Sequence, residues 1–82
     1  KPQDLKLNHL VKVISPDARV LVGKIRYIGK VPALDDTFVG VELPDDSGSS
    51  DGTYRGRRFF ICEPDQGIFV PFKKVVFSWY TT

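Results

Sequence analysis

Few side chains in this sequence are suited to catalysis. The only histidine, His9, lies in a polar segment without an obvious nucleophile or orienting carboxylate. One histidine and one cysteine, Cys62, cannot supply the three or four ligands of a zinc site. Glu63 and Asp65 flank a proline, which is typical of a solvated turn, and no glycine-rich phosphate loop precedes a helix. We therefore expect a non-catalytic domain without a metal or cofactor.

Basic side chains are the next candidates for a function. The chain has 12 Lys and Arg against 10 Asp and Glu, a net charge of +2. Arg55, Arg57 and Arg58 are close together in sequence. They fit two interpretations, contacts to an acidic partner or a solvated strand edge that opposes aggregation. The net charge is too small to indicate a nucleic-acid-binding protein.

Size and composition restrict the classes of protein further. A chain of 82 residues fits one domain, and 41% apolar with 27% charged residues is ordinary for a globular protein. No apolar run approaches the roughly 20 residues of a membrane span. A single cysteine cannot form an internal disulfide, and no signal peptide opens the chain. We expect a reducing, cytoplasmic setting.

Short runs of β-branched and aromatic residues between turn-forming residues predict an all-β domain. We expect strands at 10–14, 20–28, 37–43, 53–54, 57–62 and 68–70, and a closing strand within 75–80. Helical spacing is not sustained over ten residues anywhere. The sequence predicts a small barrel or strongly curled antiparallel sheet of about five to seven strands. Residues 1–9 are assigned to a lead-in, 10–76 to the domain, and 77–82 to a C-terminal strand or tail.

Period-two alternation predicts which side chains face the core. Ile25 and Tyr27 alternate with basic residues, so both are expected to point inward. In the third strand, Phe38 is expected on the opposite, wetter face from three apolar residues in register, which are Val39, Val41 and Leu43. Phe60 and Phe69 lie in short strands, where a core position is favoured over a groove position. Four glycines are expected to meet backbone requirements, namely Gly40, Gly52, Gly56 and Gly67.

Glycines, aromatic residues and apolar residues recur at set intervals along most of the chain. The segments are 23–29 (GKIRYIG), 38–43 (FVGVEL), 48–52 (GSSDG), Gly56, 59–62 (FFIC) and 67–70 (GIFV). In order and spacing they resemble the CAP-Gly family, the glycine-rich domain of cytoskeleton-associated proteins, from about Leu10 to Val76. The resemblance implies an SH3-like, strongly curled antiparallel β-barrel.

The resemblance also implies a function and a site. CAP-Gly domains are cytoplasmic, cytoskeleton-associated modules that bind protein partners. Their groove takes the extended acidic C-terminal tails of tubulin, end-binding proteins or linker proteins, which links them to microtubules. Backbone amides and a cation would meet the terminal carboxylate. The peptide-binding residues implied here are Phe38, Gly48, Ser49, Ser50, Asp51, Gly52, Arg55, Arg58, Phe60 and Phe69.

This sequence departs from the family pattern at the site. The signature loop reads Gly-Lys-Asn-Asp-Gly in the family, whereas Ser49 and Ser50 replace its Lys and Asn here. Phe38 stands where many members have Trp, and Ala33 where a Phe usually points into the groove. Losing a charged hydrogen bond and a buried aromatic ring would weaken binding of the usual ligand about a hundredfold or more.

Besides a purely structural repeat that binds nothing at its altered groove, two alternatives therefore stay open. The altered loop resembles the CAP-Gly repeats of the CYLD-type deubiquitinase, which implies a docking repeat that binds a proline-containing peptide of a signalling adaptor. The second alternative is a nucleic-acid or modified-lysine reader that uses Phe38, Tyr54 and Phe59 as stacking or cage residues.

Overall fold

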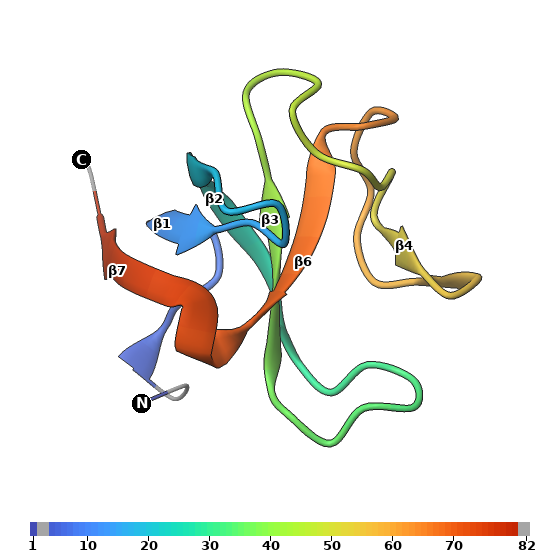
Figure 1. Cartoon of the computed structure of the whole chain (residues 1–82), viewed down its shortest axis with the longest axis horizontal. Helices are drawn as coiled ribbons and strands as arrows, with labels where there is room; N and C mark the ends of the chain where they lie inside the picture. Colours follow the sequence, from blue (N-terminus) through green and yellow to red (C-terminus); the bar gives the residue numbers. More distant parts are fainter. Residues whose placement is uncertain (2–3, 81–82) are drawn as a thin grey trace.

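The computed structural model describes residue 1 and residues 4–80, which form seven strands and one short 3-10 helix (Figure 1). The strands are β1 (Leu10–Ile14), β2 (Val20–Gly29), β3 (Phe38–Glu42), β4 (Thr53–Tyr54), β5 (Arg57–Arg58), β6 (Gly67–Pro71) and β7 (Val75–Trp79). The 3-10 helix η2 (Phe72–Lys74) joins β6 to β7. Within the described residues, no helix has the length and apolar character to cross a bilayer. The predicted all-β class is confirmed.

Five strands form one antiparallel sheet in the order β6-β3-β2-β1-β7, and β4 pairs with β5 in a separate hairpin. Strands β6 and β7 are the edges of the large sheet and do not pair with each other in the described part of the chain. The predicted strongly curled β-barrel is therefore not confirmed, since the sheet does not close. Figure 1 shows β1 and β7 on one side of the molecule and β4 on the other.

The larger core lies on one face of the sheet. Period-two alternation along β1 and β3 places every second side chain there, which confirms the prediction for Val39, Val41 and Leu43. Its buried members are Val11, Val13, Ile25, Val39, Val41, Leu43, Ile68 and Val70. The described part of the predicted lead-in also contributes, because Leu5 packs against this cluster and the amide of Ile25 donates to the carbonyl of His9 at 2.9 Å.

A smaller aromatic core lies on the other face of β3. It contains Phe38, Phe60, Phe69 and Val31. Phe38 points away from Val39 and Val41, as expected, but it is only 9% exposed, so the prediction of a wet position is wrong. Phe60, which is distant in sequence, covers this face. A Cβ on Gly40 would lie 2.6 Å from the Phe60 ring. The absence of a side chain at Gly40 thus leaves room for the covering segment.

A β-bulge in β2 separates two residues that were expected to share a face. Ile25 pairs with Val41, whereas Tyr27 pairs with Gly40, and the register shifts between them. One extra residue in a strand reverses the alternation beyond it. Ile25 therefore belongs to the larger core, and Tyr27 packs against the aromatic core. The prediction that both point to one core is wrong.

Two predicted boundaries also change. The strand expected over 57–62 is only the two-residue β5, because the amides of Phe59 and Phe60 turn back to donate to the carbonyl of Gly52. At the C-terminus, β7 begins at Val75 and pairs with β1, so it crosses the predicted boundary after residue 76. The parts of the predicted lead-in and tail at residues 2, 3, 81 and 82 lie outside the described residues.

Candidate functional site

A groove of about 350 Å³ opens beside the aromatic core. Segments distant in sequence form it: the β1–β2 turn, β3, the loop before β4, the β4–β5 hairpin and β6. The lining residues are Pro16, Phe38, Ser49, Ser50, Thr53, Tyr54, Arg55, Ile68, Phe69 and Pro71. The structure thus brings together five of the ten predicted site residues, namely Phe38, Ser49, Ser50, Arg55 and Phe69.

Aromatic rings give the groove an apolar wall. The Tyr54 ring lies 6.2 Å from Phe38 and 5.4 Å from Phe69, measured between ring centroids. Phe38 and Phe69 are held by the aromatic core, so this wall is preorganised. Flat apolar surfaces of this kind accept the side chains of an extended peptide.

Arg55 is the only charged residue among those that line the groove, and no carboxylate lines it. Arg55 and Gly56 connect β4 to β5, and both have positive φ, at 51° and 83°. Two positive φ values are the requirement of a type I′ hairpin turn. The Arg55 side chain is exposed, with its guanidinium carbon 5.8 Å from the Tyr54 ring centroid. The groove therefore favours a negatively charged ligand.

The loop from Gly48 to Gly52 has already used most of its hydrogen-bond donors. The amide of Gly48 donates to the carbonyl of Asp65 at 2.8 Å, and those of Ser49 and Ser50 donate to the carbonyl of Gly67 at 2.9 Å each. The Ser50 hydroxyl donates to the carbonyl of Thr53 at 2.6 Å and accepts from the amide of Gly52 at 3.0 Å. These groups stabilise the loop, so they are not free to bind a ligand's carboxylate.

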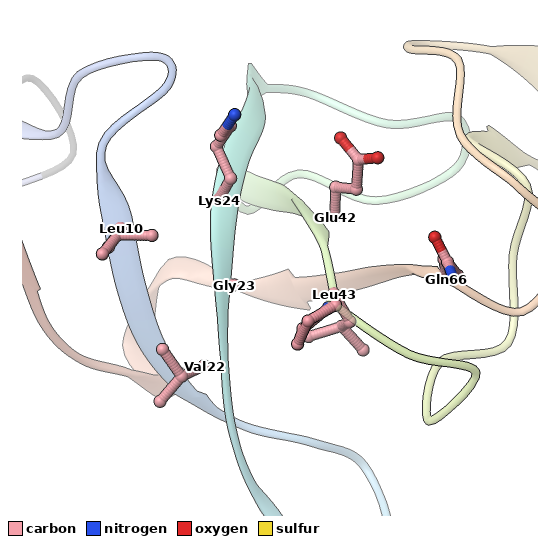
Figure 2. A pocket seen from close by; sticks show the side chains of 8 residues that line it. Leu10, Val22, Gly23, Lys24, Glu42, Leu43 and Gln66 are labelled. Carbon is pink, nitrogen blue, oxygen red and sulfur yellow. The ribbon is translucent and has the colours of Figure 1, made fainter.

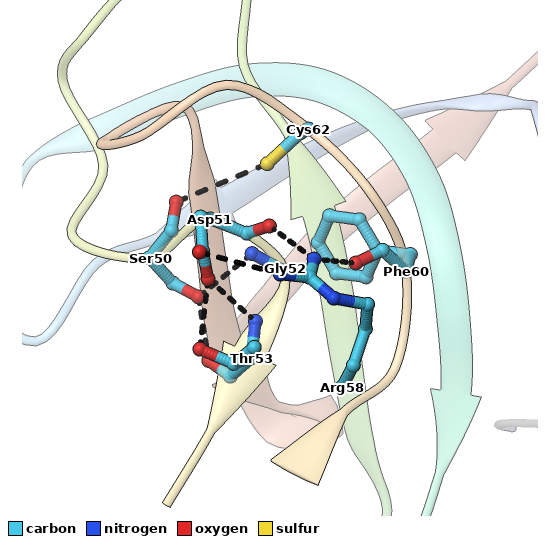
Figure 3. Close-up of polar contacts among 7 residues, drawn as sticks. All are labelled: Ser50, Asp51, Gly52, Thr53, Arg58, Phe60 and Cys62. Carbon is cyan, nitrogen blue, oxygen red and sulfur yellow. Dashed lines mark hydrogen bonds and ion pairs between the residues drawn. The ribbon is translucent and has the colours of Figure 1, made fainter. Parts of the chain in front are cut away.

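Asp51 and Arg58 fix the other side of this loop (Figure 3). Asp51 Oδ1 accepts from the hydroxyl of Thr53 at 2.8 Å and its amide at 3.2 Å. The hydrogen bond from the Thr53 side chain is the main reason that the pKa of Asp51 is lowered. Arg58 donates from one nitrogen to the carbonyls of Asp51 and Phe60, at 2.9 Å each. Asp51 and Arg58 thus shape the loop and do not line the groove.

Gly52 is required by close packing. Its φ is +99°, and a Cβ built there would lie 1.9 Å from the carbonyl oxygen of Phe60. A Cβ on Gly48 would lie 2.4 Å from the carbonyl oxygen of Gly67. Five of the predicted site residues do not line the groove, namely Gly48, Asp51, Gly52, Arg58 and Phe60.

Sequence reasoning missed several lining residues. Pro16, Thr53, Ile68 and Pro71 were not among the predicted site residues, and Tyr54 was considered only as a cage residue. Pro16 and Pro71 enter the groove because the β1–β2 turn and the end of β6 lie beside it. Nothing in the local sequence signals that proximity. A proline at the end of a strand indicates a turn, but it does not indicate what the turn lies beside.

Two other residues considered for binding lie outside the groove. Ala33 is exposed, has φ +69° and is not a lining residue. Phe59 packs on Tyr27 and Phe69, with ring centroids 4.7 and 5.7 Å apart, while Arg57 lies 5.2 Å from the Phe59 ring. Phe38, Tyr54 and Phe59 therefore do not form one aromatic cage.

Metal-binding and nucleophilic groups are sparse in the structure. Within the described residues, no three His, Cys, Asp or Glu side chains gather closely enough to hold a metal ion. Burial is the main cause that raises the pKa of the Cys62 thiol, with Glu42 and Asp51 acting in the same direction. A raised pKa keeps this thiol protonated and poorly nucleophilic near neutral pH.

The match to a family model agrees with this geometry. Residues 9–75 match the model described as the CAP-Gly domain, which is most of the chain. The chain belongs to the CAP-Gly family. The resemblance inferred from the glycine and aromatic spacing is therefore confirmed.

Known CAP-Gly proteins and structures are similar to this chain. CAP-Gly domain-containing linker protein 1 homolog of Caenorhabditis elegans is 35% identical to this chain. The alignment covers 90% of this chain and 8% of that protein. The ubiquitin carboxyl-terminal hydrolase CYLD of Mus musculus is 46% identical over 62% of this chain, and the match covers 6% of it. The solved Bik1 CAP-Gly domain with an ETF peptide from Bim1 is 28% identical and has a TM-score of 0.69. That alignment covers 89% of this chain and 83% of the solved one.

Proposed function

We propose that this CAP-Gly domain is a non-catalytic module that binds an extended, acidic peptide in the groove beside Phe38, Tyr54 and Phe69. The observation that carries the proposal is the composition of the groove, an aromatic wall with Arg55 as its only charged lining residue. The solved Bik1 domain was determined with a peptide from a partner protein, which supports a peptide ligand for the family. An SH3-like curling of the sheet would suit such a groove.

The proposed ligand is a C-terminal tail of the kind carried by tubulin, end-binding proteins or linker proteins, which places the domain in the cytoplasm near the cytoskeleton. Its aromatic residue would pack on the wall that Phe38, Tyr54 and Phe69 form, and its carboxylates would face Arg55. Because the amides of the 48–52 loop are already engaged, we expect the terminal carboxylate to depend on Arg55 more than on the loop. Binding should consequently be weaker than in members with a lysine in the loop.

The variant Arg55→Asn tests the role of the cation without disturbing the turn. Asparagine followed by glycine is the preferred pair in a type I′ turn, so the hairpin should be at least as stable. Affinity for a peptide ending in Glu-Glu-Tyr should fall roughly three- to tenfold, since a charge-assisted hydrogen bond is worth about 1 kcal/mol more than a neutral one. Isothermal titration calorimetry measures the affinity, and a thermal melt checks the fold.

The same peptide with an amidated C-terminus is the control. If the carboxylate contacts Arg55, amidation should weaken binding to the natural domain and have little further effect on the variant. Unchanged affinity of the variant for the free-carboxylate peptide would contradict the assignment of Arg55. Failure of the natural domain to bind either peptide would contradict the proposed ligand.

A second candidate function is a docking repeat that binds a proline-containing peptide of a signalling protein. It is favoured by one observation: the groove has aromatic and proline walls but Ser49 in place of the loop lysine. Aromatic-lined grooves accept extended proline-rich segments, which need no charge. Tighter binding of a proline-rich peptide, unaffected by Arg55→Asn and by salt, would favour this function over the first.

A further inference from the structure

The outward face of β1, β2 and β7 carries an apolar surface that the proposed peptide groove does not use. Strand register aligns Leu10 with Lys24 and Trp79, Lys12 with Val22 and Phe77, and Ile14 with Val20. These side chains point away from the larger core because Val11 and Val13 point into it. The apolar members of this outer face are Leu10, Ile14, Val20, Val22, Phe77 and Trp79.

Several of these side chains are strongly exposed. Val20 is 62% exposed, Phe77 54% and Val22 40%. A cavity of about 410 Å³ adjoins the outer face, and Figure 2 shows Leu10, Val22 and Lys24 around it. Contiguous exposed apolar surfaces of this kind mark sites of association. Figure 1 shows β1 and β7 across the molecule from β4, one of the elements that line the peptide groove, and none of the apolar members of the outer face lines that groove.

The charge of the outer face indicates what covers it. Its two charged members are Lys12 and Lys24, and no carboxylate points outward from the described residues of these three strands. Glu42 of β3 is opposite Lys24 in the strand register, but it is already paired with Arg26 at 2.6 Å. A symmetric contact between two copies would bring lysines together with no acid left free to compensate them, which is unfavourable. A partner with acidic groups around an apolar centre is complementary.

The dimensions of the outer face match one helix. Three adjacent strands place the outer two about 10 Å apart, and five residues of strand extend about 17 Å. An α-helix is about 10–12 Å wide, and three turns are about 16 Å long. Apolar sheet faces in domains are commonly covered by such helices. We propose that the outer face binds an amphipathic helix of a partner protein, whose apolar stripe is bordered by Asp and Glu residues that meet Lys12 and Lys24.

The only tryptophan of the chain, Trp79, lies on the outer face and reports its occupancy. The probe is a stapled helical peptide with a leucine stripe bordered by glutamates. The control peptide has the same sequence with lysines in place of the glutamates. We expect the glutamate peptide to shift Trp79 emission to the blue saturably, and to bind at least about tenfold more tightly than the lysine peptide.

The double variant Lys12→Glu with Lys24→Glu should reverse this preference, so that the lysine peptide binds more tightly. Arg55→Asn, in the groove, is the matched control and should leave both affinities unchanged, which separates this site from the proposed function. Equal binding of the two peptides, or no change in Trp79 emission, would overturn the proposal. So would a dimer of the natural domain that Phe77→Ser dissociates in sedimentation equilibrium, because a second copy would then cover the outer face.

Discussion

At the scale of single residues, Gly52 and Gly56 have the same backbone requirement but different surroundings. Both have positive φ, at 99° and 83°, yet a Cβ on Gly52 would meet the carbonyl of Phe60, whereas a Cβ on Gly56 would have no atom within 4 Å. Alanine at Gly56 therefore adds only backbone strain. Alanine at Gly52 adds strain and forces the 59–62 segment to move.

We predict that Gly56→Ala lowers stability by about 1 kcal/mol, which is roughly 4–8 °C in Tm for a domain of this size. Gly52→Ala should cost clearly more, about 2–4 kcal/mol, because the close contact is with backbone that cannot rotate away. Thermal melts followed by circular dichroism compare the two variants directly. Equal losses would show that the 48–52 loop does not approach Phe60 as described.

At the scale of elements, the backbone of the 48–52 loop gives the site its shape, and the Ser49 side chain can be changed to alter the charge of the site. Hydrogen bonds to Asp65, Gly67 and Thr53 fix the loop, while the exposed Ser49 side chain lines the groove. Ser49→Lys should therefore keep the fold and add a cation beside the ligand. We expect about a tenfold rise in affinity for the Glu-Glu-Tyr peptide, equivalent to 1.4 kcal/mol.

An amidated peptide is again the control, because an added lysine attracts any acidic peptide at long range. Most of the gain should disappear with the amide if the lysine meets the terminal carboxylate. A gain of the same size for both peptides, lost at high salt, would assign it to general attraction. No gain at all from a folded variant would mean that the peptide binds elsewhere.

The elements also show how far the sequence alone determines the fold and the site. Alternation predicted the core-facing side chains Val39, Val41 and Leu43, and a β-branched run predicted β1, because both signals depend only on neighbouring residues. The bulge between Ile25 and Tyr27 depends on pairing with β3, and the burial of Phe38 depends on residues 53–62 folding over it. Family spacing found Ser49 and Ser50, but the entry of Pro16 and Pro71 into the groove follows from tertiary packing alone.

At the scale of the whole molecule, three carboxylates link stability to pH. Hydrogen bonds from Ser15, Ser47 and Thr53 are the main causes that lower the pKa of Asp17, Asp45 and Asp51 below the ordinary 3.8. A lowered pKa in the folded state contributes stability above pH 3.8 that is lost as the pH falls through the folded value. Since all three groups are exposed to solvent, the effect of each is small.

We predict that the contribution of these three groups to the free energy of unfolding is constant between pH 5 and 7 and declines below about pH 4. Asp51→Asn keeps an oxygen that accepts from Thr53 but cannot titrate, so its decline should be shallower. Urea denaturation at a series of pH values measures both slopes. Parallel slopes for the natural protein and the variant would show that Asp51 has the same pKa folded and unfolded.

The pairing of β1 with β7 has a mechanical consequence. Leu10 is opposite Trp79, and the hydroxyl of Ser78 donates to the carbonyl of Leu10 at 2.6 Å, so the outer ends of the two strands lie side by side. Tension applied through flanking polypeptide would pull these ends apart at right angles to the strands. Their hydrogen bonds would break one after another, as in unzipping, because the force acts on a single hydrogen bond at a time. A domain pulled in this way would yield first at β7, which is an edge strand of the large sheet, and at low force.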